Sequence, residues 1–425
     1  MSGASSEAGS VAEWRAAFET FLGTDAAAMG PKTRTKAFER FAEEGVPTRR
    51  HEYWKYTTPR ALTPATVVQA RTTQDAFAGV DAFRLVFVDG RLDAARTDRD
   101  ALAAAADVSG PDGAPWMDRV FGVLQGQPLK DAHRQVSRPI ADLNLSLWSD
   151  GIALRVPKGV DLPKPIHLRY EGDAPAHLRI ALLVEEGASA TLLESGPGAL
   201  TTGAEIVLER GAKLHHLRAQ NEIAGQHYAS LFTEIGEGAH FASFTLSADA
   251  ELVRNETVMT LAGDSAVGHI AGALLAGGKS HIDNTIYVVH GAEHGESRQV
   301  FKNVLDGSAK GVFQGKILVQ KGAQKTDGYQ ISQSLLLDER AEFNAKPELE
   351  IYADDVACSH GSTSGAIDET ALFYLRSRGM ERRTAEALLV AAFAEEAIAE
   401  IADDDLQEVM RQTVEAWMAQ RRSDG

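Results

Sequence analysis

The segment RIALLVEEGASATLLES at residues 179–195 contains two short β-like runs joined by a small turn. The turn itself, Glu186-Gly187-Ala188, has close counterparts further along the chain. They are Arg210-Gly211-Ala212, Glu237-Gly238-Ala239, Ala262-Gly263-Asp264 and His290-Gly291-Ala292. Successive glycines of this series lie 24 to 28 residues apart, a period that is typical of solenoids. The pattern predicts rungs of short strands that pair with their neighbours and bury a shared inner face.

Similar β-like runs continue on both sides of this segment. They include IALRV, IHLRY, EIVLER and TIYVVH, and they fall between about Pro139 and Ser364, where helical periodicity is lost. A β-sandwich also uses many short strands. We favour a parallel β-helix because the turn spacing is regular and the glycine turns recur with similar flanks. The sequence therefore predicts a mainly β protein whose core is a right-handed parallel β-helix over residues 136–365.

The N-terminal region, residues 1–135, shows mixed α and β patterns. Val11, Trp14 and Phe18 recur at helical spacing, and Pro31 stands where a second helix would begin. The run FRLVFV at Phe83–Val88 predicts a buried strand that ends in an Asp-Gly turn. We expect a helical and mixed α/β domain in front of the solenoid.

The C-terminal region, residues 366–425, returns to helical patterns. Asp368 is placed to cap a first helix that ends at Gly379. A second helix carries several apolar residues, and a third is predicted to begin at Asp405, with Glu408 completing a capping box. We expect these helices to close one end of the solenoid, as terminal caps do. Their surplus of apolar surface also indicates a docking face.

Composition excludes several classes of protein. Lys plus Arg is 43 and Asp plus Glu is 60, and a net charge of −17 argues against a general nucleic-acid binder. The single cysteine, Cys358, cannot form a disulfide within the chain, which fits a reducing compartment. The N-terminus lacks the pattern of a signal peptide, and no apolar run is long enough to span a bilayer. We therefore expect a cytoplasmic protein with no membrane contact.

Two weaker patterns concern phosphate and metal binding. The stretch Gly278-Lys279-Ser280 resembles part of a Walker A loop, but the earlier glycine is Ala273 and the following residues alternate like a strand. We expect no nucleotide to be bound there. Histidines also gather in the repeats, at His215, His216, His227, His240, His269, His281, His290 and His294. They lack the spacing of a dedicated zinc site, and polar side chains on a solenoid also simply stack.

The segment from Pro347 to Met380 carries the most specific chemistry. Cys358 and His360 are two residues apart, so in an extended segment both point to the same side. A thiolate binds soft metals, and we expect the neighbouring imidazolium to lower the pKa of the thiol. Two ligands do not complete a four-ligand iron site, so a partner would have to supply the rest. The alternative is an ordinary free cysteine beside a hydrogen-bonded histidine.

This segment also resembles a known family. LEIYADDVACSHGSTSGAIDETALFYLRSRG at residues 349–379 is similar to the C-terminal signature of the SufB/SufD family of iron–sulfur assembly proteins. PTRRHEYWKYT at residues 47–57 resembles an N-terminal motif of that family. The resemblance covers most of residues 47–60 and 285–380, with a looser match between them. The CSHG form and the absence of further cysteines are typical of the SufD branch.

The resemblance implies a fold and a set of partners. The family fold is a parallel β-helix flanked by helical ends. The family is expected to act as a non-catalytic scaffold, with a SufB-like subunit bound at the end of the β-helix and a SufC-like ATPase bound on the C-terminal helices. Candidate ATPase contacts are Leu388, Leu389 and Phe393. A transient iron–sulfur cluster would be shared with the SufB-like subunit, with His360 and Cys358 as candidate interface ligands and metal ligands. This chain would bind no nucleotide. A homodimer is an alternative assembly when the partner is absent.

Two enzyme hypotheses stand against this interpretation. A parallel β-helix rich in acidic residues also suits a secreted-type polysaccharide lyase or hydrolase, which needs paired carboxylates in an outer groove. A transferase with Cys358 as nucleophile and His360 as base is the other hypothesis. The sequence argues against the first hypothesis because such enzymes are usually secreted and no signal peptide is present. It argues against the second because no third residue is evident that would orient the histidine.

Overall fold

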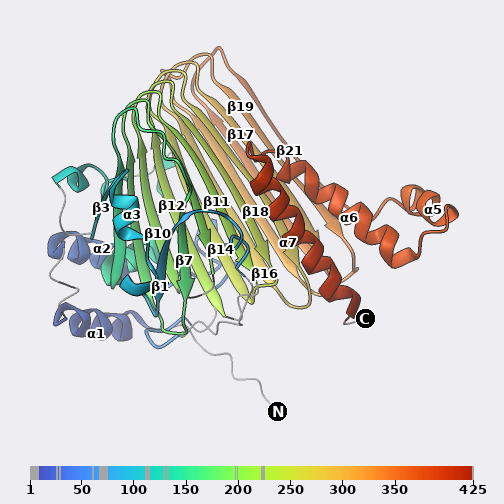
Figure 1. Cartoon of the computed structure of the whole chain (residues 1–425), viewed down its shortest axis with the longest axis horizontal. Coiled ribbons are helices and arrows are strands. Elements are labelled where there is room, and N and C mark those ends of the chain that lie inside the picture. Colours follow the sequence, from blue (N-terminus) through green and yellow to red (C-terminus); the bar gives the residue numbers. More distant parts are fainter. Residues whose placement is uncertain are drawn as a thin grey trace.

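The chain forms a parallel β-solenoid built from two long sheets that face each other (Figure 1). The computed structural model describes residues 9–24, 27, 30–59, 62–66, 75–110, 115–127, 130–131, 134–196, 198, 200–221 and 225–423. Strands alternate between the two sheets along the chain from β6 to β21, and each pairs in parallel with the strand two places away. The prediction of a mainly β protein with a parallel β-helix is confirmed.

The ten-stranded sheet contains β2 (Arg91–Leu92), β1 (Phe83–Val88), β7 (Ile166–Glu171), β9 (Ser189–Ser195), β11 (Lys213–Asn221), β13 (His240–Ala248), β15 (Val267–Ala276), β17 (Glu296–Leu305), β19 (Asp327–Leu336) and β21 (Ala357–Gly365). The nine-stranded sheet contains β20 (Glu342–Ile351), β18 (Lys310–Val319), β16 (His281–His290), β14 (Leu252–Leu261), β12 (Gln226–Ile235), β10 (Thr201–Leu208), β8 (His177–Val184), β6 (Asp150–Val156) and β3 (Asp107–Ser109). A small hairpin pairs β4 (Lys130–Asp131) with β5 (Arg134–Gln135).

The α-helices are α1 (Val11–Leu22), α2 (Pro31–Glu44), α3 (Arg99–Ala103), α4 (Pro139–Leu147), α5 (Glu369–Ser377), α6 (Arg382–Ile398) and α7 (Asp404–Ser423). Short 3₁₀ turns lie at Glu52–Trp54, Ala94–Arg96 and Pro115–Arg119. None of the helices in the described part of the chain is long and apolar enough to cross a bilayer.

The recurring turns place one residue of each rung in the left-handed region. Gly187, Gly211 and Gly238 have φ of 66°, 65° and 59°, a conformation in which glycine meets no steric penalty. In the next two rungs the equivalent residue is Ser265 or His294, each with φ of 57°, and not the predicted Gly263 or Gly291. The backbone hydrogen bonds from one turn to the next link these residues in the same way. The predicted repeat is therefore correct for the first three turns and two to three residues out of step in the next two.

The inner faces of both sheets form one continuous apolar core. It includes Leu182, Leu192, Ile206 and Phe241, all of which are almost completely buried. Because strands of the same sheet pair in register, side chains of one face line up from rung to rung. The start of this core is closed by α3, whose Leu102 packs into the same cluster.

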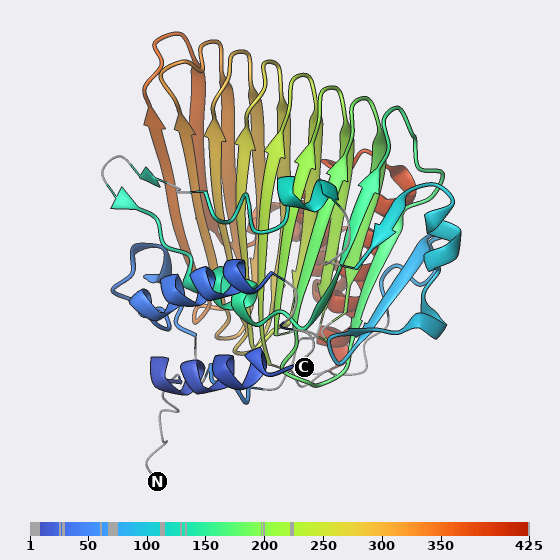
Figure 2. The same ribbon diagram turned by 90° about the vertical axis from the view of Figure 1, so that its left-hand side faces the viewer.

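The N-terminal helices cover the outer face of the nine-stranded sheet (Figure 2). The predicted α1 and α2 are confirmed, with Trp14 and Phe38 buried between them and the sheet. The helix α4 was not predicted, because no helical periodicity is evident in the sequence from Pro139 onward. All nine of its residues are buried, and its polar residues Asp142, Asn144 and Ser146 alternate with leucines, a pattern typical of a strand.

The C-terminal helices lie on the outer face of the ten-stranded sheet, on the side opposite the N-terminal helices (Figure 2). The apolar stripe of α7 and the residues Val390 and Ala394 of α6 pack on Ala271 and Val300 of the sheet. The expectation that these helices close one end of the solenoid is therefore wrong. They cover a sheet face, and they leave the end formed by β20 and β21 exposed.

The caps of the C-terminal helices are partly as predicted. The Asp368 carboxylate accepts hydrogen bonds from the backbone N–H groups of Thr370 and Ala371, as expected of an N-cap. The third helix begins at Asp404 and not at Asp405, and the Asp403 carboxylate accepts from Leu406 N at 3.0 Å. Three consecutive aspartates can each act as a cap, so the sequence alone did not select the first of them.

Candidate functional site at the open end of the solenoid

The last rung of the solenoid exposes both its strands. No residue of β20 or β21 is buried, whereas β18, the strand before β20 in its sheet, is buried at nine of ten positions. Ile351 and Tyr352 are 40% and 51% exposed at the end of β20. No strand pairs beyond β20 or β21 among the residues that the structure describes. The rung thus presents free backbone donors and acceptors next to the uncovered edge of the apolar core.

Cys358 and His360 both lie on β21 and start from the same face. In the parallel register Cys358 pairs with Gly328, and His360 pairs with Gln330. Cys358 is half-buried and packs against the apolar core, with its Sγ 3.2 Å from the position that a Cβ on Gly328 would take. His360 is exposed. The two predicted ligands therefore share one side of the strand, as expected, but only the imidazole is freely accessible.

The surroundings of Cys358 favour the protonated thiol. Burial raises the pKa of Cys358, and the negative charge of Asp327 raises it further, while a backbone hydrogen bond from Gly328 opposes them. This direction is opposite to the one expected from the neighbouring histidine, so that expectation is wrong. A metal bound here would first have to displace the thiol proton.

Metal ligands are dispersed over the rest of the solenoid. Among the described residues, no group of three or more His, Cys, Asp and Glu side chains could hold a metal ion. His216 and His290 point inside and bond Glu194 and Ser297, whereas His281 lies outside beside Thr57. The histidine series of the repeats thus spreads over both faces. Cys358 and His360 supply at most part of a ligand set.

The three predicted ATPase contacts of α6 differ in exposure. Leu388 is 49% exposed, Leu389 is half-buried, and Phe393 packs against the chain's own ten-stranded sheet. The ammonium group of Lys302 lies 4.7 Å from the centre of the Phe393 ring. The neighbouring helix α5, which projects away from the solenoid, exposes Phe373 by 73% and Tyr374 by 57% (Figure 1). Phe373, Tyr374 and Leu388 are together termed the helical patch.

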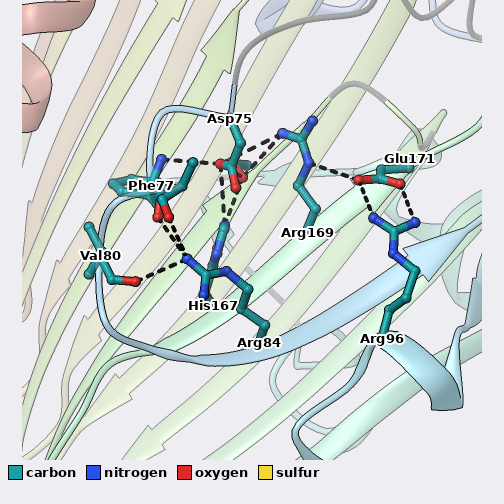
Figure 3. A network of polar contacts seen from close by, with 10 residues as sticks. Asp75, Phe77, Val80, Arg84, Arg96, His167, Arg169 and Glu171 are labelled. Atoms are coloured by element: carbon teal, nitrogen blue, oxygen red, sulfur yellow. Dashed lines mark hydrogen bonds and ion pairs between the residues drawn. The ribbon is translucent and has the colours of Figure 1, made fainter.

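A buried Asp-Ser-His group lies elsewhere in the fold (Figure 3 shows its Asp and His). Ser195 Oγ donates to Asp75 at 2.8 Å and lies 2.8 Å from His167 Nε2. In a nucleophilic triad the carboxylate would bond the other ring nitrogen, but Asp75 lies nearest to Nε2, at 3.7 Å. Burial also lowers the pKa of His167 to about 4. The group fixes the segment from Asp75 onward on the sheet and does not have the geometry of a catalytic triad.

The aromatic motif at residues 47–57 reaches the open end from the outside. Trp54 is almost completely buried under the guanidinium of Arg254, at 4.0 Å, as expected of a core anchor. Glu52 of the same loop forms an ion pair with Lys346 of β20 at 3.0 Å. The loop therefore supports the last strand of the nine-stranded sheet, a role that the sequence analysis did not assign.

One indication of the open end was present in the sequence and was missed. Pro347 lies in the middle of β20, where it pairs in register with Gly315. Proline has no N–H for a strand on its other side, so within sheets it is confined to edge strands. Recognising Pro347 inside a strand would have marked β20 as the last of its sheet.

Together these features define a class of protein. The chain is a parallel β-solenoid that is closed by α3 at one end and carries an exposed histidine at its open edge. Residues 168–393 match the family model described as "SUF system FeS cluster assembly, SufBD core domain". The chain belongs to this SufBD family.

Curated relatives agree with this assignment. The chain is 31% identical to the iron–sulfur cluster assembly protein SufD of Escherichia coli, over the full length of both chains. It is 28% identical to the SufBD family protein slr0076 of Synechocystis, over 87% of each chain. It is also 28% identical to the Arabidopsis protein ABCI7, chloroplastic, over 70% of this chain and 68% of the relative. The polysaccharide lyase or hydrolase hypothesis finds no support in these matches.

Proposed function

We propose that this chain is a non-catalytic scaffold subunit that joins a SufB-like subunit through the open end of its solenoid. The observation that carries the proposal is the uncovered last rung, β20 and β21, in a solenoid whose first rung is closed by α3. Repeat arrays need both ends covered, because an open rung exposes core and unpaired backbone. A related solenoid that ends in the same way would supply matching strands.

The chemistry of the open end suits a subunit of the iron–sulfur pathway. His360 is exposed on β21, and Cys358 lies behind it at the edge of the core. Iron is cargo here, because the described residues offer no complete ligand set. At the proposed interface with the SufB-like subunit, His360 supplies one ligand to the iron, and Cys358 supplies a second after it has lost its proton. The partner supplies the remaining thiolate ligands. An imidazole holds iron less firmly than a thiolate does, which suits a cluster that must leave.

The helical patch is the proposed contact of the SufC-like ATPase. Phe373, Tyr374 and Leu388 are large apolar side chains with at least half, or nearly half, of their surface exposed. Exposed aromatic groups of this size are characteristic anchors of protein interfaces. Glu400, just after α6, bonds Arg298 of β17 at 3.0 Å, and β17 is two strands from β21 in the same sheet. A force applied to the helices would therefore reach the sheet that carries His360.

Hydrogen–deuterium exchange on the assembled complex tests this assignment. Adding the SufB-like subunit should slow amide exchange in β20 and β21, and adding the ATPase should slow exchange in α5 and α6. The sheet-covering helix α7 serves as an internal control and should keep its rate. Protection confined to the outer sheet faces, with β20 and β21 unchanged, would show that the subunits join elsewhere.

A further inference from the structure

The interior of the solenoid contains buried polar side chains near its open end. One position of the inner face starts at Leu192 and runs through the buried His216, Ser243 and Ile270 in successive rungs. In the last rungs the corresponding register position is occupied by Gln299, Gln330 and then His360. A neighbouring position runs through Asn303, Ser334 and Ser364. At these two positions the inner wall of β17, β19 and β21 therefore carries polar side chains.

These polar groups are deeply buried, and several have no partner. Gln299, Asn303 and Gln330 are 0% exposed. Within the described part of the chain, neither atom of the Gln299 amide has a hydrogen-bond partner, and the same holds for Asn303 Oδ1 and Gln330 Oε1. In folded proteins more than nine-tenths of buried polar groups are paired, and those that lack a protein partner usually bind ordered water.

The side chains are held in place by their other atoms. Gln330 Nε2 donates to the carbonyl of Gly315 on the opposite sheet at 3.3 Å, and Asn303 Nδ2 donates to Gln333 O at 2.9 Å. A Cβ on Gly315 would lie 2.6 Å from Cδ of Gln330, so only glycine leaves room for this amide. Gln330 therefore points across the interior, and its free oxygen stays inside.

We propose that ordered water molecules occupy the interior of the last rungs, bound to Gln299, Asn303 and Gln330, and reach the open end beside His360. The water that bonds Gln330 Oε1 lies one register step from the imidazole. At the outer rung Ser334 Oγ donates to Ser364 Oγ at 2.7 Å, which continues the polar row to the last strand. The inner side of His360 thus faces a hydrated interior, whether or not the histidine binds iron.

A high-resolution crystal structure of the full chain tests the proposal directly. We expect density for water within about 3 Å of the Gln299 amide and of Gln330 Oε1. Direct bonding between the two amides, with no water between them, would overturn the proposal. This experiment needs no partner and no iron, so its outcome is separate from that of the proposed function.

The variant Gln299→Leu gives a second and independent readout. If water satisfies the amide, the apolar side chain deprives that water of its partner, and the melting temperature should fall by a few degrees. The crystal structure of the variant should lose the water at position 299 and keep the one at Asn303. If the interior is dry, the variant removes an unpaired amide, and a raised melting temperature would count against the proposal.

Discussion

His360 lies in register beside Gln330 on the inner face of the ten-stranded sheet, yet Gln330 is completely buried and His360 is exposed. The two residues occupy equivalent backbone positions in successive rungs. Their exposure differs because of the strands that lie next to them. Gln330 is covered by the next rung, and His360 belongs to the last rung. The exposure of His360 is thus a property of where the solenoid stops, and whatever covers that end will also cover His360.

The open end should therefore be sensitive to charge. Ile351→Lys and Tyr352→Lys each place an ammonium group on the exposed edge of β20. We expect the affinity for the SufB-like subunit to fall by about tenfold or more, because the added charge would lose its hydration at the interface. Titration by light scattering or calorimetry measures the affinity.

Leu22→Lys is a matched control for these variants. Leu22 is 41% exposed, but it lies at the end of α1, outside the last rung. Its replacement should leave the affinity unchanged. Equal weakening by all three variants would indicate a general charge effect and not an interface at β20.

The helical patch and Phe393 should respond differently to substitution. Phe373→Glu and Leu388→Glu alter exposed side chains, so we expect normal stability and reduced ATPase binding. Phe393→Ala removes a ring that packs on the chain's own sheet and should lower the free energy of unfolding by about 1–3 kcal/mol. Urea unfolding and a pull-down with the ATPase separate the two effects. Loss of ATPase binding in Phe393→Ala alone would place the contact on the opposite side of α6.

The stability of the fold should decline in mild acid. Burial lowers the pKa of His177 and of His290 to about 4, below the usual value of about 6.5. Between these pH values the unfolded chain therefore binds more protons than the folded chain does. The contribution of the neutral histidines to the free energy of unfolding is fully present above pH 6.5 and is lost as the pH falls toward 4. Well inside that window each histidine contributes about 1.4 kcal/mol per pH unit.

Denaturant unfolding at several pH values measures this slope. His177→Gln and His290→Gln each remove one buried imidazole and should make the decline less steep. A slope in either variant that equals that of the wild type would show that the histidine is not held neutral by the fold.

A buried ion pair between β8 and β10 of the nine-stranded sheet also contacts the N-terminal region. Arg179 and Glu205 are both 0% exposed, and their side chains meet at 2.8 Å. Glu205 also accepts a hydrogen bond from Gln125 N at 2.8 Å. Glu205→Leu leaves the guanidinium unpaired and should lower the free energy of unfolding by about 3–5 kcal/mol. The double variant Arg179→Met, Glu205→Leu should recover the part of that loss that comes from the unpaired guanidinium, and a further loss in the double variant would contradict the pairing.

The sequence predicted elements whose causes are local. The strand Phe83–Val88, the cap at Asp368 and the shared face of Cys358 and His360 follow from short-range rules of backbone geometry. The helix α4 was missed because polar residues alternate with leucines along residues 142–147, which resembles the period of a strand. The third helix was predicted to start at Asp405 because neighbouring aspartates are equivalent caps, and Asp403 holds that place.

The open end could not be derived from the helical patterns of the C-terminal region. An apolar stripe such as that of α7 shows that a helix packs against something, but not whether it covers a sheet face or the end of a solenoid. The direction of the pKa shift of Cys358 was likewise decided by the depth of the thiol in the core. Both depend on contacts between residues far apart in the chain.

Anaerobic cluster reconstitution in the assembled complex tests the central role of the open end most directly. Wild type, His360→Ala and the control His240→Ala would each be combined with the SufB-like subunit and the ATPase, and iron and sulfide would be measured after removal of the excess. His240 is also exposed, but it begins β13, four strands from β21 in the same sheet. We expect that all three proteins assemble equally and that only His360→Ala retains less cluster. If His360→Ala builds and holds clusters as well as wild type, His360 is not a ligand, and the cluster belongs to the partner alone.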